Sequence, residues 1–80
     1  MKVICLFPSI HFVLKAEKAL KARGLKPKLI PVPKEISSDC GMAIELARED
    51  LPRVGDLPSE LKPEAFYLRT PQGYQKLLDS

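Results

Sequence analysis

The sequence contains no tryptophan, a single histidine and only two cysteines, and none of its apolar runs approaches the length of a membrane span. A structural zinc site usually takes four Cys or His ligands at close spacing, which these three residues do not provide. Cys5 and Cys40 are too few and too far apart in the sequence for a disulfide-dense secreted scaffold. We therefore expect reduced thiols, no metal, no cofactor, no membrane segment and a location in the cytoplasm.

The composition is typical of one small globular domain that spans residues 1–80, with 45% hydrophobic and 29% charged residues. The net charge of +3 is unevenly distributed along the chain. Residues 1–36 contain eight Lys or Arg and two acidic residues, whereas residues 37–80 contain five and eight. Such an excess can attract an anion or an acidic partner, but it is too small to predict binding of nucleic acid, and we expect none.

Short runs of apolar and β-branched residues predict four strands, over residues 2–7, 28–32, 42–47 and 65–70. Residues 42–47 would also suit a helix, but the alternation of their larger apolar side chains favours a strand. A regular helix is predicted over residues 10–23, which are rich in helix formers and lie between a serine and a glycine suited to cap it. A helix broken by prolines and a glycine follows over residues 50–62, and a short helical tail over residues 71–78.

The order of these elements, βαββαβ, predicts an α+β fold of the ferredoxin-like kind, a two-layer sandwich. In that fold an antiparallel four-stranded sheet carries both helices on one face. Pro31 cannot donate a hydrogen bond to a neighbouring strand, so we expect the second strand at one edge and the charged fourth strand at the other. The sheet face without helices would be wet or would form a homodimer.

The strongest chemical signal is the segment Pro31–Gly41, with the sequence PVPKEISSDCG. Its prolines stiffen the exit from a strand, and Cys40 stands directly before Gly41 at the entry to the next strand. Gly41 allows a positive φ or a close approach by another molecule, and successive N–H groups at such a turn can hold an anion. Together with Lys34, these groups would stabilise a thiolate, a persulfide or a selenide on Cys40.

The longer stretch PVPKEISSDCGMAIEL resembles the family of Se/S carrier protein-like domains, together with four residues of the first part of the chain: Phe7, Glu17, Leu20 and Gly24. The resemblance covers roughly residues 2–70. Members of that family show a PVPR-x-ISSSCG-x-A pattern, whose cysteine falls on Cys40, its glycine on Gly41 and its serines on Ser37 and Ser38. Asp39 occupies the place of a third serine, and an adjacent carboxylate disfavours a thiolate.

The resemblance implies that Cys40 accepts a sulfane sulfur or a selenium atom and passes it to a partner protein. The partners would be sulfur or selenium donor and acceptor proteins, TusA-like proteins among them, although the CPxP motif of TusA is absent here. Lys34, Ser37, Ser38 and Gly41 are the expected binding residues around Cys40.

Other interpretations of the same residues remain open. Cys40 would also fit as a small buried residue at a tight turn, and the two serines as the hydroxyls of a local turn. The chain would then be a non-catalytic ferredoxin-like module that dimerises or docks on a larger protein. A third interpretation is anion or nucleotide binding at the basic helix and the glycine turn, although no Walker or Rossmann signature is present. Cys5 is expected in the core, and His11 on the solvated surface.

Overall fold

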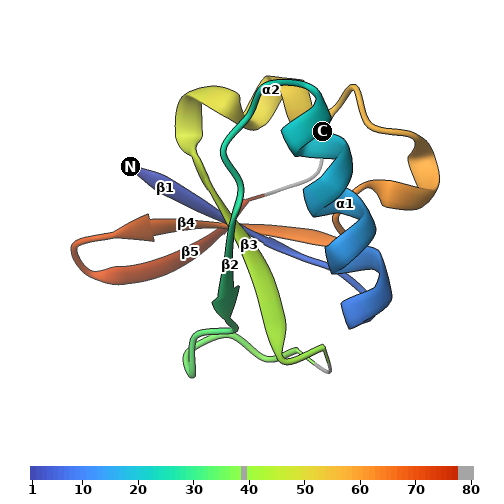
Figure 1. The fold of residues 1–80 in the computed structure, drawn as a ribbon. Coiled ribbons are helices and arrows are strands. Elements are labelled where there is room, and N and C mark those ends of the chain that lie inside the picture. Colours follow the sequence, from blue (N-terminus) through green and yellow to red (C-terminus); the bar gives the residue numbers. More distant parts are fainter. Residues whose placement is uncertain (39, 78–80) are drawn as a thin grey trace.

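The computed structural model describes residues 1–38 and 40–77, and an antiparallel sheet lies at its centre (Figure 1). The described strands are β1 (Lys2–Leu6), β2 (Lys28–Pro31), β3 (Met42–Ala47), β4 (Ala65–Thr70) and β5 (Gly73–Leu77). Their order across the sheet is β2-β3-β1-β4-β5, and every neighbouring pair is antiparallel. The four predicted strands are confirmed, and so is the edge position of the strand that contains Pro31.

The helical segments differ in length, as the positions of proline and glycine predict. α1 (Ile10–Ala22) is regular, and the chain leaves it through Gly24, whose φ is +81° and whose N–H donates to the Lys21 carbonyl at 3.0 Å. The predicted broken helix consists of three short pieces: η1 (Arg48–Asp50), α2 (Leu51–Val54) and η2 (Ser59–Leu61). Proline has no N–H to continue a helical hydrogen-bond ladder, so Pro52 and Pro58 stand near the starts of such pieces and not within a long helix.

The predicted helical tail over residues 71–78 is wrong as far as residue 77, and residue 78 lies outside the described part. β5 pairs with β4 as a hairpin, in which Thr70 stands opposite Gly73. The Thr70 hydroxyl donates to the Gly73 carbonyl at 3.0 Å and accepts from the Gln72 N–H at 3.2 Å, and Gly73 has a φ of +128°. This turn chemistry, together with the unpaired edge that β4 would otherwise expose, outweighs the helical propensity of the tail. The sheet therefore has five strands and not four, and β4 is not an edge strand.

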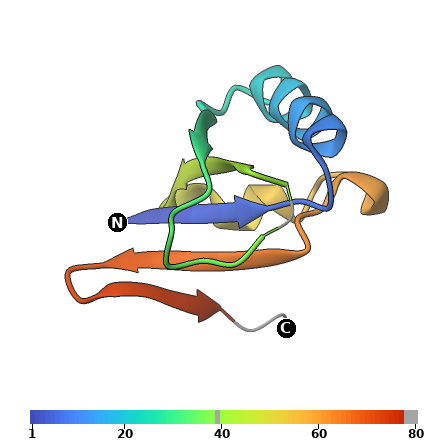
Figure 2. The same cartoon turned by 90° about the horizontal axis from the view of Figure 1, so that it is seen from below.

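The larger apolar core lies between the sheet and the helical segments. Figure 2 shows α1 on one side of the strands. Alternate residues of β1 and of the segment after it point to that side, where they meet the buried face of α1 and residues from the region around α2. This core comprises Val3, Cys5, Phe7, Val13, Ala16, Leu20, Leu25, Ile44, Leu46, Val54, Leu57 and Leu68. We refer to it as the helix-side core.

The other face of the sheet carries no helix in the described part of the chain, but its apolar residues are nevertheless buried. Ile4, Leu6, Ile36 and Ala43 form a second cluster there, and Ile36 comes from the segment after β2 and not from the sheet. Partly buried residues from the edges of the sheet surround this cluster: Ile30, Val32, Ala65, Tyr67 and Tyr74. Homodimer formation through this face stays a prediction. The apolar residues that would drive it are already covered by the chain itself.

The same face holds an ion pair between a buried carboxylate and a partly exposed guanidinium. Glu45 of β3 is 9% exposed, and its carboxylate lies 2.7 Å from the Arg69 guanidinium of β4. The guanidinium also lies over the Tyr74 ring of β5, 5.8 Å from the ring centre. These contacts couple β5 to the middle of the sheet, because the β5 tyrosine and the β3 carboxylate hold the same arginine.

Candidate functional site

The thiol loop, residues 32–41, joins β2 to β3 and contains the predicted site. Where the ladder of the two strands ends, the Val32 N–H donates to the Gly41 carbonyl at 3.0 Å and closes the neck of the loop. Inside the loop the Ile36 N–H donates to the Pro33 carbonyl at 2.9 Å. The Ile36 side chain is 4% exposed, because it packs into the cluster on the helix-free face. The loop is therefore fixed to the sheet by both its neck and an apolar side chain.

The Cys40 side chain packs on the face of the sheet opposite to Ile36. Its side chain is partly buried and packs against the helix-side core, whereas Ile36 packs on the helix-free face. The loop consequently passes around the end of the sheet from one face to the other between these two residues. Cys40 is a free thiol that keeps part of its surface open to solvent. The alternative interpretation of Cys40 as a small buried residue at a tight turn holds in part, because the side chain packs against the core without being fully buried.

The backbone around Cys40 has a defined geometry. The Cys40 N–H donates to the Ser38 hydroxyl oxygen at 3.2 Å. The next residue, Gly41, has a φ of +80°, a conformation that costs a residue with a Cβ about 1 kcal/mol or more. Apart from the two chain neighbours of Gly41, no atom of the described residues lies within 4 Å of the place where its Cβ would stand, so the glycine answers a conformational requirement of the backbone.

The predicted binding residues do not all lie together. Ser38 and Gly41 adjoin Cys40 and shape its backbone, whereas Lys34 and Ser37 are exposed. Among the described residues no hydrogen bond or ion pair joins Lys34 or Ser37 to Cys40. The predicted effect of Asp39 falls on a residue outside the described part of the chain.

The thiol loop reaches the end of the sheet at which α1 begins. β1 and β3 are antiparallel, with Cys5 opposite Ile44, so the end of β1 lies beside the start of β3. The chain enters α1 only a few residues after β1, and both Figure 1 and Figure 2 place the start of α1 near the entry to β3. The N-terminal end of a helix carries a positive partial charge. Sequence reasoning missed this proximity, although the predicted order of the elements already implied it.

Cys5 lies in the middle of β1, between Ile44 of β3 and Phe66 of β4. It is 1% exposed, and burial raises the pKa of its thiol to about 12. A thiol with this pKa is almost entirely protonated at neutral pH and is therefore a poor nucleophile. The expectation that Cys5 is a core residue is confirmed.

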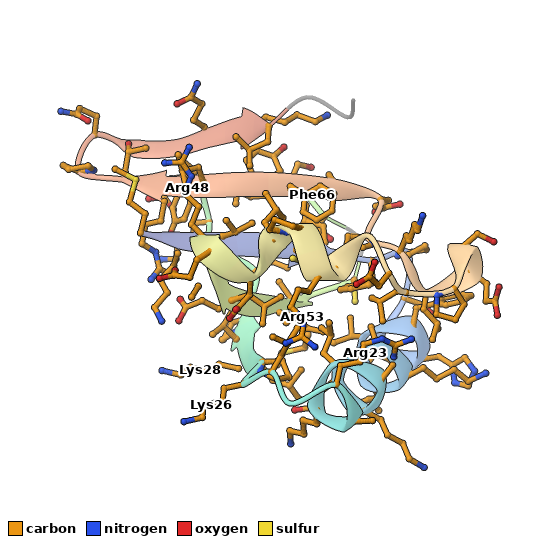
Figure 3. All side chains as sticks on the ribbon, turned by 90° about the horizontal axis from the view of Figure 1, so that it is seen from above. Arg23, Lys26, Lys28, Arg48, Arg53 and Phe66 are labelled. Carbon is orange, nitrogen blue, oxygen red and sulfur yellow. The ribbon has the colours of Figure 1, made fainter. Side chains whose placement is uncertain are left out.

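Five basic residues lie toward the opposite end of the sheet, spread from the C-terminal end of α1 to the end of β3: Arg23, Lys26, Lys28, Arg48 and Arg53 (Figure 3). The Arg53 guanidinium donates to the Arg23 carbonyl at 2.7 Å and so caps the C-terminal end of α1. The six residues of β3 separate this basic end from the thiol loop by roughly 20 Å. Three of the eight basic residues of the segment 1–36, namely Arg23, Lys26 and Lys28, thus lie far from Cys40.

Two further classes of site can be assessed on residues 1–38 and 40–77. No cluster of three His, Cys, Asp or Glu side chains in this part of the chain could hold a metal ion. No helix in it has both the length and the apolar character needed to cross a membrane.

Comparison with known proteins gives one match. The family model described as "Putative Se/S carrier protein-like" matches residues 2–68, which is most of the chain. The predicted resemblance to this family is thereby confirmed. No curated protein and no solved structure matches the chain.

Proposed function

This chain belongs to the Se/S carrier protein-like family, and we propose that it carries a sulfane sulfur or a selenium atom on Cys40. One observation carries the proposal. Cys40 is a free, partly exposed thiol on a loop that both of its flanks hold in place. A carrier needs a thiol that two different proteins can reach in turn, and Cys40 meets that need while Cys5 does not.

The proposed loading step is a thiol exchange without net oxidation. The Cys40 thiolate attacks the outer sulfur of a donor persulfide, a new S–S bond forms, and the S–S bond of the donor breaks. The donor leaves as a thiolate and takes up the proton of the transferred sulfur or one from solvent. In the unloading step an acceptor thiolate attacks the outer sulfur of the Cys40 persulfide, and Cys40 returns to a thiolate. Selenium would follow the same two exchanges.

The neighbouring residues support the persulfide in this proposal. The Ser38 oxygen already accepts the Cys40 N–H at 3.2 Å, so its O–H is left to donate to a charged sulfur. Gly41 keeps the backbone in the conformation that presents the thiol. Lys34 and Ser37 are exposed, and the long stem of the lysine lets its ammonium approach an anionic cargo. The partners would be donor and acceptor proteins of the cytoplasm, where thiols stay reduced, with TusA-like proteins among the candidates.

Intact-mass and peptide-mapping spectrometry after incubation with a cysteine desulfurase and cysteine tests the proposal. We expect an adduct of one sulfur atom on Cys40, its loss with dithiothreitol, and no adduct in Cys40→Ala. Cys5→Ala is the matched control and should keep the adduct. A wild-type chain that gains no sulfur, or a Cys40→Ala chain that gains as much, would contradict the proposal.

A second candidate function is a non-catalytic interaction module. Two large apolar side chains of α1, Ile10 and Leu14, are 45% and 50% exposed, and such exposure favours a protein contact. If binding alone were the function, Cys40→Ser would bind its partner as the wild type does, and the Cys40 thiol would be alkylated no faster than free cysteine.

A further inference from the structure

The outer face of α1 exposes two large apolar side chains to solvent. Ile10 and Leu14 are, with Met1, the large apolar side chains that the described residues leave exposed. They stand four residues apart and therefore lie side by side on the helix. The buried residues of α1 are Val13, Ala16 and Leu20, and at 100° per residue the exposed pair lies beside that buried stripe. Ile10 and Leu14 are not among the residues of the helix-side core.

Positive charge borders this apolar pair. Lys15 and Lys18 are exposed on the same outer side of α1, and Lys18 follows Leu14 by one helical turn. Among the described residues, neither of these two lysines takes part in an ion pair, whereas Lys21 lies 3.5 Å from Glu17. The outer face of α1 is therefore an apolar pair beside two cations, with its one carboxylate engaged by a third.

The position of the face links it to the thiol. Ile10 opens α1, and α1 begins at the end of the sheet that the thiol loop also reaches. A protein that covers Ile10 and Leu14 would consequently lie next to the loop that bears Cys40. The five basic residues at the other end of the sheet lack this relation, and two of them are engaged in capping α1.

We propose that the outer face of α1, with Ile10, Leu14, Lys15 and Lys18, is the docking surface for the protein that loads Cys40, and that this protein presents an apolar patch bordered by carboxylates. The inference rests on the proposed carrier function. The apolar pair would supply most of the contact energy, because exposed apolar side chains become buried on docking. The lysines would speed the encounter with an acidic surface and make it sensitive to salt.

Two sulfur donors separate docking from chemistry. The protein donor is the cysteine desulfurase of the source cell, supplied with cysteine, and the small donor is glutathione persulfide, which needs no docking surface. The rate at which Cys40 gains one sulfur is followed by mass spectrometry for each donor. Ile10→Ala/Leu14→Ala removes the apolar pair and retains good helix formers, and Lys15→Glu/Lys18→Glu reverses the charge. Lys26→Glu/Lys28→Glu reverses two charges at the distant basic end and is the matched control.

We expect each α1 variant to be loaded about tenfold more slowly by the desulfurase and at the wild-type rate by glutathione persulfide. The control variant should match the wild type with both donors, and added salt should slow the desulfurase reaction of the wild type but not that of Lys15→Glu/Lys18→Glu. Equal desulfurase rates in the α1 variants and the wild type, or equal slowing in the control, would overturn the docking surface. Failure of wild-type Cys40 to gain sulfur from either donor would overturn the carrier function itself.

Discussion

Cys5 and Cys40 both contact the helix-side core, but they reach it from different kinds of backbone. Cys5 belongs to a central strand with a neighbouring strand on each side, so its surroundings are apolar and its backbone groups are used in the sheet. Cys40 comes from a loop, where part of its surface meets solvent and a serine hydroxyl accepts its N–H. Both cysteines pack in the helix-side core. What distinguishes the core residue Cys5 from the candidate carrier residue Cys40 is that one lies in a central strand and the other in a loop.

The difference shows what a small fold needs in order to present one thiol. Loops carry function more readily than strands, because their backbone groups and side chains remain accessible to a partner. A loop holds its side chains less firmly than a strand does. Here two contacts fix the loop: Ile36 packs on one face of the sheet, and the Val32 N–H donates to the Gly41 carbonyl at the neck. The burial of Ile36 thus serves the placement of Cys40, although the two residues lie on opposite faces.

Alkylation should show the largest difference between the two thiols. With iodoacetamide at pH 8, Cys40 of the folded chain should be modified at least 1000-fold faster than Cys5, because only about one in 10,000 thiols with a pKa of about 12 is ionised at that pH. Peptide mapping measures both rates. In Cys40→Ala no label should appear until denaturant is added, and labelling of Cys5 within tenfold of Cys40 would break the comparison.

The raised pKa of Cys5 should also make the free energy of unfolding depend on pH in alkaline solution. The folded thiol has a pKa of about 12, and the unfolded thiol has the ordinary value of 9.0, so above pH 9 unfolding releases a proton and rising pH favours the unfolded state. Between pH 9 and pH 11 the wild type should lose about 2 kcal/mol more unfolding free energy than Cys5→Ala. Urea titrations under reducing conditions measure this loss. Cys40→Ala should keep it, and equal losses in the wild type and Cys5→Ala would show that Cys5 ionises in the folded state.

Most of the fold could be predicted because its elements carry local signals. The apolar run of β1 and the lysine-rich helix α1 need no tertiary information to be recognised, although Ser9 makes no side-chain capping hydrogen bond. β5 was missed because GYQKL is short and only weakly apolar, and its strand conformation depends on the open edge of β4. The turn residues before β5, Thr70, Pro71 and Gly73, were the local sequence feature that indicated a hairpin.

The candidate site could be predicted only in its local part. The positive φ of Gly41 follows from the residue type, and the contact between Ser38 and Cys40 spans two positions of the chain. The partial exposure of Cys40 and the role of Ile36 depend on which residues of distant elements cover them. The nearness of α1 to the thiol loop was implied by the element order, but Ile10 and Leu14 had no signal of their own, since apolar residues in a helix are usually buried.

The backbone of Gly41 offers the smallest and most selective change. Gly41→Ala places a Cβ at a φ of +80°, where it meets no described atom beyond its two chain neighbours, so the expected cost is about 1 kcal/mol of backbone strain. Gly24→Ala is a closely matched control, because Gly24 has a φ of +81° and the same open surroundings at the far end of α1. Both variants should lower the free energy of unfolding by similar amounts in urea titrations.

Only Gly41→Ala should change the thiol. Relief of the strain would rotate the peptide beside Cys40 and weaken the 3.2 Å hydrogen bond to Ser38, so the alkylation rate of Cys40 should change by about twofold or more, whereas Gly24→Ala should leave it at the wild-type value. If both variants alter the Cys40 rate equally, the loop responds to overall stability. A change confined to Gly41→Ala would show that the local loop backbone sets the reactivity of the partly exposed Cys40. The backbone of Cys5, in contrast, is held by the two strands that flank β1.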